Sequence, residues 1–279
     1  MPLVLVQRLL TALVLIPLVT LGVFNLSQPI FELVIAVFLL IGGREWARLA
    51  GIGRLVTQLL YVGMLAGCML LAGLWLDYSP VSGLDQHLLL LGVVGWIALA
   101  IKTLTVREIS VRTSGIGFST AVLGLLVLTI AAVSVASIRE RSDGGWLFMS
   151  LLLLVWTADS AAYFAGRAWG KHKLAPVLSP KKTWEGALGG ALGTTLLGLG
   201  LGLWVFNLSG QHLAGYLLLC LCVVVLSIIG DLFESLLKRR AAIKDSGVLL
   251  PGHGGVLDRV DSLLAASPFY AFGVGWVWA

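Results

Sequence analysis

The chain reads LAGYLLLCLCVVVLSIIGDLF at residues 213–233, with no charged side chain before Asp231. A bilayer core about 30 Å thick needs about 20 mostly apolar helical residues, because unpaired backbone groups cannot face lipid. This stretch therefore predicts a transmembrane helix. The whole chain has the same character, since 58% of its 279 residues are hydrophobic, 12% are charged, and the mean hydropathy is +0.99. That composition excludes a soluble domain, a disordered chain and a secreted disulfide scaffold.

Comparable apolar stretches recur along the sequence. We predict an all-α polytopic integral membrane protein with about nine transmembrane helices, at residues 9–26, 30–43, 56–76, 88–101, 116–138, 146–165, 186–206, 213–233 and 262–278. The first stretch is longer than the apolar region of a signal peptide and no small-residue cleavage site follows it, so we interpret it as an uncleaved span.

The basic residues predict the orientation of these spans. With a cytoplasmic N-terminus and an external C-terminus, all of the 19 Lys and Arg residues except Arg139 and Arg141 lie on the cytoplasmic side, as the positive-inside rule requires. Two long polar segments, 166–185 and 231–261, then lie on the cytoplasmic side. We therefore divide the chain into N-terminal scaffold helices (1–140) and a C-terminal catalytic region (141–279).

Segment 231–261 begins with a polar stripe. If the helix at 213–233 continues outward, Asp231, Glu234, Ser235 and Lys238 lie on one of its faces, because residues three and four apart are neighbours on a helix. Asp231 lies at or below the lipid headgroups, where a carboxylate is costly to desolvate. Such a residue indicates function unless a partner explains it.

Asp258 and Asp261 open the last predicted span and share one face of its first turn. A single Asp there could be a helix cap. Two carboxylates exceed what a cap requires, and oxygen ligands suit a hard divalent cation such as Mg²⁺, with Asp231 as a further ligand.

Between these acids lies the glycine-rich stretch 251–255, which contains His253, Gly254 and Gly255. Glycines allow the backbone to approach a ligand, and consecutive N–H groups can then point at an oxyanion. Neither the turn nor the histidine is specific alone. Basic residues precede the turn and acidic residues follow it, and phosphoryl or nucleotidyl transfer requires this combination.

Segment 166–185 contains a second basic cluster. We interpret Ser179 as a helix N-cap and Pro180 as the first helical residue. Lys181 and Lys182 would then oppose the helix dipole, which an anionic ligand would relieve. Upstream, Asp159 lies within a predicted span and could pair with a basic residue or approach the metal.

Small residues at four-residue spacing follow, as in Gly189 and Gly193. They predict close helix packing, either within the chain or across a homodimer.

The run from Ser235 through Lys238, Arg239, Lys244, the glycine stretch and Asp258 to Asp261 resembles the signature of the phosphatidate cytidylyltransferase (CDP-diacylglycerol synthase) family. Weaker similarity covers 156–170 and 179–186. The resemblance implies a nucleotidyltransferase of the bacterial-type inner (plasma) membrane, with its active site on the cytoplasmic side. It would join CTP and phosphatidic acid to give CDP-diacylglycerol and pyrophosphate in phospholipid biosynthesis, with Mg²⁺.

The residues that match the family motif receive roles by this resemblance. Metal would be held by three acids, Asp231, Asp258 and Asp261, which with Lys244 form the catalytic set. The expected substrate-binding residues are Lys181, Lys182, Ser235, Lys238, Arg239, His253, Gly254, Gly255 and Arg259. Whether a second, monovalent cation also binds stays open. The expected partners are the two substrates and membrane lipid, without nucleic acid.

Three other classes of protein compete with this hypothesis. A CDP-alcohol phosphotransferase would carry an Asp-Gly and Ala-Arg lead and acids four apart, whereas Asp258 and Asp261 are three apart. A transporter or channel would place its charges near mid-bilayer across the spans rather than late in the chain. A lipid or polyprenol kinase would share the metal and phosphate groups, and it stays open.

Overall fold

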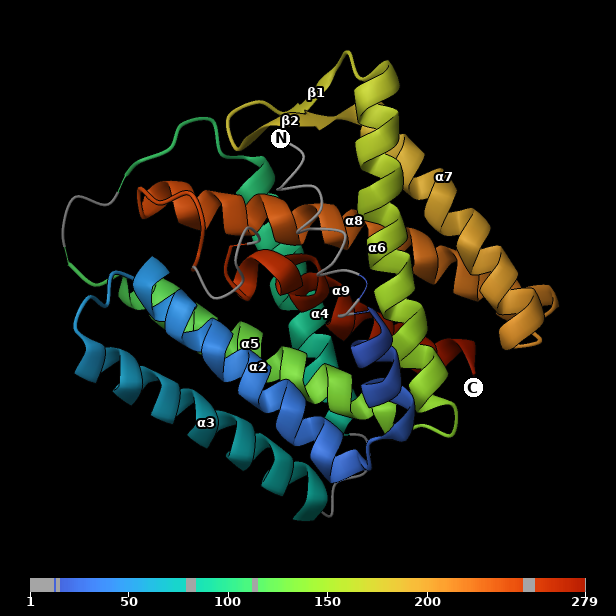
Figure 1. The fold of residues 1–279 in the computed structure, drawn as a ribbon, viewed down its shortest axis with the longest axis horizontal. Helices are drawn as coiled ribbons and strands as arrows, with labels where there is room; N and C mark the ends of the chain where they lie inside the picture. Colours follow the sequence, from blue (N-terminus) through green and yellow to red (C-terminus); the bar gives the residue numbers. More distant parts are fainter. Residues whose placement is uncertain (1–12, 14–15, 79–83, 112–114, 248–253, 279) are drawn as a thin grey trace.

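The computed structural model describes residues 13, 16–78, 84–111, 115–247 and 254–278 (Figure 1). The described part is helical apart from one small β-hairpin. Its elements in chain order are α2 (Gln28–Leu49), α3 (Leu55–Tyr78), α4 (Leu84–Leu104), α5 (Phe118–Arg139), α6 (Gly144–Trp169), β1 (Lys173–Ala175), β2 (Ser179–Thr183), α7 (Trp184–Gly200), the π-helical turn η1 (Leu201–Val205), α8 (Gly210–Arg240) and α9 (Leu257–Val277).

Six helical segments in the described residues are long and apolar enough to cross a membrane: α3, α4, α5, α6, α7 with η1, and α8. They coincide with six of the nine predicted spans. The other three predicted spans are not among these six segments. The predicted span 9–26 lies partly outside the described residues, and Ile16–Asn25 forms a short apolar helix. Helices α2 and α9 are long, but their first or last turns carry charged residues, so their status as spans stays a prediction.

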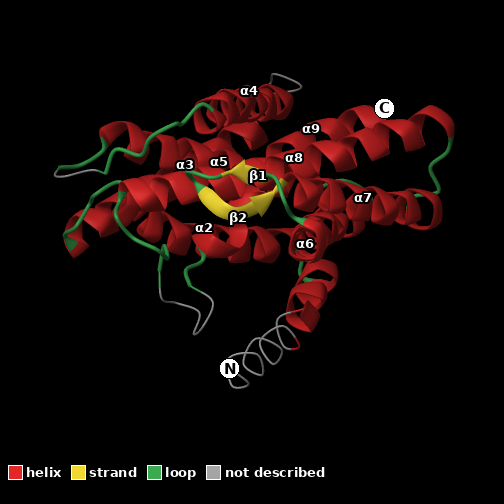
Figure 2. Ribbon diagram, turned by 90° about the horizontal axis from the view of Figure 1, so that it is seen from above, coloured by secondary structure: helices red, strands yellow, loops and turns green. Residues whose placement is uncertain are grey.

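Helices α8 and α9 pack along each other in the middle of the molecule. Helix α9 also contacts α4 and α5, and α5 in turn contacts α2 and α3. In the view of Figure 2, α6 is seen end-on and the hairpin lies over the helices. Phe233 of α8 packs against Trp46 of α2, with ring centroids 6.2 Å apart, and against Trp96 of α4, with ring centroids 5.6 Å apart. The N-terminal helices therefore support the middle of α8.

Helices α6 and α7 are close neighbours because small residues line both of them (Figure 1). A Cβ atom added at Gly189 would lie 2.2 Å from Cβ of Ala165, and one at Gly193 would lie 2.8 Å from Cβ of Ala161. Glycine spacing in this part of the chain therefore serves packing within one chain, which was one of the two readings left open by the sequence.

The hairpin corrects one prediction. Ser179 and Pro180 do not begin a helix, because Ser179–Thr183 is strand β2, which pairs antiparallel with β1 (Lys173 opposite Thr183). The residue before a proline favours extended backbone, which continues here through the two lysines. Helix α7 begins at Trp184, and the N-cap is Thr183, whose side-chain oxygen accepts a hydrogen bond from the Gly186 amide at 3.1 Å.

The helical prediction for the start of segment 231–261 is confirmed. Helix α8 runs without interruption to Arg240, so Asp231, Glu234, Ser235 and Lys238 belong to one helix. Helix α9 begins at Leu257, which places Asp258 in its first turn as predicted, whereas Asp261 is the fifth residue of the helix and lies beyond that turn.

Candidate active site

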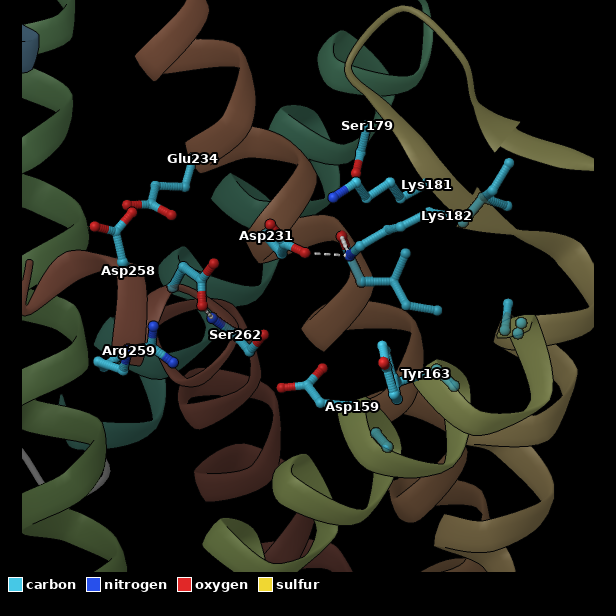
Figure 3. A pocket seen from close by; sticks show the side chains of 18 of the residues that line it. Asp159, Tyr163, Ser179, Lys181, Lys182, Asp231, Glu234, Asp258, Arg259 and Ser262 are labelled. Carbon is cyan, nitrogen blue, oxygen red and sulfur yellow. Dashed lines mark hydrogen bonds and ion pairs between the residues drawn. The ribbon is translucent and has the colours of Figure 1, made fainter. Parts of the chain in front are cut away.

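A cavity of about 1010 Å³ lies where α6, the hairpin, the start of α7, α8 and the start of α9 meet. Figure 3 shows how its side chains are distributed: Lys181 and Lys182 reach in from the hairpin, while Asp159, Asp231 and Asp258 approach from the helices. Basic and acidic side chains therefore face one another across the same space.

Lys182 connects the two sides of the cavity. Its Nζ lies 2.6 Å from Oδ2 of Asp231 and 3.4 Å from the carbonyl oxygen of Ile228, both on α8. The side chains of Lys182 and Asp231 are 23% and 35% exposed, so a ligand can reach both. Lys181, its neighbour on β2, is exposed and also lines the cavity.

Asp258 is held by several donors at once. Its Oδ1 lies 2.6 Å from Nζ of Lys238, and its Oδ2 accepts hydrogen bonds from the Gly255 amide at 2.8 Å and from the amide and hydroxyl of Ser246 at 3.0 Å each. Burial would raise the pKa of Asp258, but these bonds outweigh burial and lower the pKa below its ordinary value. Asp258 is therefore ionised at neutral pH. Lys238 also pairs with Glu234 at 2.8 Å.

The acids deeper in the cavity are less well neutralised. Asp159, Asp231, Glu234 and Asp261 all line the cavity. Neither Asp159 nor Asp261 makes an ion pair with any described residue, and Oε1 of Glu234 is buried without a hydrogen-bond partner in the described part. This surplus of hard oxygen ligands fits a cation such as Mg²⁺.

The arrangement of these acids is open rather than closed around one point. Among the described residues, no group of three or more Asp, Glu, His or Cys side chains lies in a position to hold a metal ion by itself. Mg²⁺ commonly takes only one or two protein carboxylates and completes its coordination with water and substrate phosphates, so an open arrangement is compatible with it.

The structure brings most of the predicted site residues together. The cavity is lined by Lys181, Lys182, Asp231, Lys238, Lys244, Gly254, Asp258, Arg259 and Asp261. His253 lies outside the described residues. Three other predicted residues are absent from this lining. The Ser235 hydroxyl lies 3.4 Å from Oδ1 of Asp231, Nε of Arg239 donates to the Leu178 carbonyl at 2.7 Å, and Gly255 contacts Asp258 through its amide.

Two acids in or near the site received no role from the sequence. Glu234 was recognised as part of the polar stripe, and its pairing with Lys238 is an i,i+4 contact within α8, but its burial depends on how α8 packs in the fold. Glu45 lies on α2, just beyond the predicted span 30–43, and contacts the segment that leads into α9. The signal that could have identified Glu45 is the cost of an acid at the end of an apolar helix.

Comparison with known proteins agrees with this site. Residues 6–276 match the family model described as "Cytidylyltransferase family". The chain belongs to the cytidylyltransferase family. A protein named phosphatidate cytidylyltransferase from Pseudomonas aeruginosa is 40% identical over 273 residues, which covers 97% of this chain and 98% of that protein. One with the same name from Haemophilus influenzae is 34% identical over 95% of this chain and 97% of its own length.

A third relative, from Brucella suis, carries the same name and is 43% identical over 192 residues, or 68% of this chain and 67% of its own length. The family match extends over both halves of the chain, including the N-terminal helices. This member of the cytidylyltransferase family is thus a multi-pass membrane protein with bacterial relatives along nearly its whole length.

Proposed function

We propose that this chain transfers the cytidylyl group from CTP to phosphatidic acid, giving CDP-diacylglycerol and pyrophosphate, as the names of its relatives indicate. The observation that carries the proposal is the cavity in which the two lysines of the hairpin face the carboxylates of the helices (Figure 3). Such a cavity can accept two phosphate-bearing substrates and a cation.

The reaction requires alignment of the two substrates more than activation of the nucleophile. A phosphomonoester has a second pKa of about 6, so at neutral pH the phosphatidate phosphate is already an oxyanion nucleophile. Its oxygen attacks the α-phosphorus of CTP, a new P–O bond forms, and the bond from the α-phosphorus to the bridging oxygen breaks as pyrophosphate leaves. The protein must hold two polyanions together against their repulsion and stabilise the charge on the leaving group.

The basic side chains supply attraction for these anions. Lys181 and Lys182 enter from the hairpin, and Lys244 and Arg259 line the opposite side of the cavity. We assign Lys181 and Lys182 to the lipid phosphate or CTP, and Lys244 and Arg259 to the CTP phosphates. Lys182 must exchange its contact with Asp231 for a substrate phosphate in order to bind one.

The acidic side chains would hold Mg²⁺. The proposed ligand set is Asp231, Asp258 and Asp261, with Asp159 nearby, and Asp258 can join it only if Lys238 gives up its bond to Oδ1. When bound, the ion would reduce the repulsion between phosphates and stabilise the departing pyrophosphate. Whether a second, monovalent cation also binds stays open.

We further propose that the cavity opens toward the cytoplasm of a bacterial-type inner membrane, with the N-terminus on the same side and the C-terminus outside. CTP would then arrive from the cytoplasm, while the lipid would enter sideways between helices. In this arrangement residues 1–140 act as scaffold and residues 141–279 carry the chemistry. Whether the protein forms a homodimer stays open. Gly189 and Gly193 of α7 do not support a dimer, because they pack against α6 of the same chain.

The activity test uses purified protein with phosphatidate, Mg²⁺ and CTP labelled at either the α- or the γ-phosphate. We expect α-label to enter the lipid. Transfer of the γ-label to lipid would indicate a lipid kinase. If neither labelled form of CTP gave labelled lipid, nucleotidyl transfer would be rejected.

A further inference from the structure

Glu45 is a buried acid in the N-terminal half of the chain that the mechanism above does not use. It lies on α2, is 3% exposed, and makes no ion pair with any described residue. Its carboxylate accepts hydrogen bonds from the Val256 amide at 3.0 Å and the Leu257 amide at 2.9 Å, and it lies 2.9 Å from the Ser246 hydroxyl, whose single proton it shares with Asp258. Ser246 and Val256 belong to the connection between α8 and α9, and Leu257 is the first residue of α9, so all three donors lie about 200 residues further along the chain.

The backbone of this connection is fitted closely around the carboxylate. A Cβ atom at Gly247 would lie 2.2 Å from Oε1 of Glu45, and one at Gly255 would lie 2.4 Å from Oε2. Gly247 and Gly255 therefore leave room for the Glu45 carboxylate, and at Gly255 an added Cβ would also lie 2.2 Å from the Ser246 hydroxyl oxygen. The negative charge also lies at the N-terminus of α9, where the helix dipole favours it.

Glu45 and Asp258 hold the same short segment from opposite sides. The Ser246 hydroxyl lies 2.9 Å from Glu45 and 3.0 Å from Asp258, and the Gly255 amide donates to Asp258. Asp258 lines the cavity, whereas Glu45 does not. Any influence of Glu45 on the reaction must therefore pass through the residues that it holds.

We propose that Glu45 is a positioning residue, which fixes Ser246 and the first turn of α9 so that Gly254 and Asp258 face the nucleotide side of the cavity. The assignment of that side to CTP rests on the proposed function. A glutamine at this position would replace one acceptor oxygen with an NH₂ group that faces a donor, so at least one of the three hydrogen bonds must break.

The test compares three variants of the full chain in detergent or lipid: Glu45→Gln, Glu45→Asp and the control Glu32→Gln. Glu32 lies on the same helix, where it bonds only to Gln28 among the described residues. We expect Glu45→Gln to lower kcat/KM for CTP by about 10- to 100-fold, with the KM for phosphatidate within about twofold. Glu45→Asp, which keeps the charge and both acceptors, should recover part of this loss, and Glu32→Gln should behave as the parent protein.

Amide hydrogen exchange provides a readout that does not depend on the reaction. We expect Glu45→Gln to speed exchange at Val256 and Leu257 while leaving exchange in α3 unchanged. Unchanged kinetics and exchange would overturn the proposal. So would a raised KM for phosphatidate in place of the CTP effect, or a loss of folded protein with full activity in the folded remainder. If the parent protein lacks cytidylyl transfer but the exchange effect appears, the proposed function fails while the positioning of this segment by Glu45 stands.

Discussion

The two sides of the cavity are held in place by different forces. On the hairpin side, α6 and α7 meet through glycine and alanine, with a Cβ at Gly189 only 2.2 Å from that of Ala165. On the opposite side, Ser246, Gly255 and Leu257 are held by hydrogen bonds to the carboxylates of Glu45 and Asp258. One side depends on close apolar packing, and the other depends on polar contacts between distant parts of the chain.

The difference shows how a polar site can be built next to lipid. The packed side needs no buried charge to hold its shape, so Lys181 stays exposed and Lys182 stays partly exposed for anions. The polar side concentrates acids, and its N–H and O–H donors stabilise the charge that a cation would otherwise have to balance.

The largest effect is expected from Asp261, on the polar side. Asp261→Asn should lower turnover by at least about 100-fold, because an oxygen ligand that suits a cation is lost from the cavity while the loop contacts of Asp258 remain. Steady-state assays of the purified variant would check this result, with the exposed Asp143→Asn as the control. Wild-type turnover in Asp261→Asn would contradict the assignment of Asp261 to the metal.

The two lysines of the hairpin differ in their contacts and should differ in effect. Lys182→Met should lower kcat/KM by about 10- to 100-fold, because Asp231 loses its ion-pair partner and the substrate loses a cation inside the cavity. Lys181→Met should cost less, since Lys181 is exposed and makes no ion pair with a described residue. Equal losses of kcat/KM in the two variants, measured in the same assay, would show that the ion pair between Lys182 and Asp231 does not matter for activity.

Asp258 should affect folding as well as activity. Asp258→Asn weakens the bond to Lys238 and the loop contacts, which we expect to reduce the free energy of unfolding by about 2 kcal/mol at neutral pH. Because the folded protein lowers the pKa of this carboxyl, its stabilising effect is full above the ordinary value of 3.8 and is lost as the pH falls below it. Thermal unfolding of both proteins across pH should show the difference shrinking in acid, whereas a constant difference would exclude the charge as its cause.

The smallest effect is expected on the packed side. Gly189→Ala should reduce the free energy of unfolding by about 1 to 3 kcal/mol, because the added methyl group collides with Ala165. Gly63→Ala on α3 is the matched control, since nothing lies within 4 Å of its added Cβ, and it should be neutral or stabilising. A destabilisation that is equal in the two variants would attribute the effect to helix propensity instead of packing.

Local patterns predicted much of this molecule. The apolar run before Asp231 and the spacing of Glu234, Ser235 and Lys238 were sufficient to place these side chains on one long helix, because helical neighbours follow from spacing alone. The small residues of α7 likewise predicted close packing. The β-hairpin was missed because the Ser-Pro pair is compatible with both a helix start and an extended strand, and the tertiary contacts decide between them.

The role of Glu45 could not be predicted in the same way. Its partners lie about 200 residues away, and no local pattern relates α2 to the start of α9. The pairing of Lys182 with Asp231 likewise depends on how the hairpin folds over α8. Contacts of this kind follow from topology, which the sequence pattern does not specify.

The contact between Arg239 and the Leu178 carbonyl also bears on how many anions the site can attract. This guanidinium belongs to the motif, yet its Nε donates to the turn that joins β1 to β2 and thereby ties α8 to the hairpin. The hydrogen bond leaves the positive charge intact but directs the guanidinium to this turn, and Arg239 is absent from the cavity lining. Counting basic residues in the motif therefore overstates the number of cations inside the cavity, and replacing Arg239 would remove a link between α8 and the hairpin.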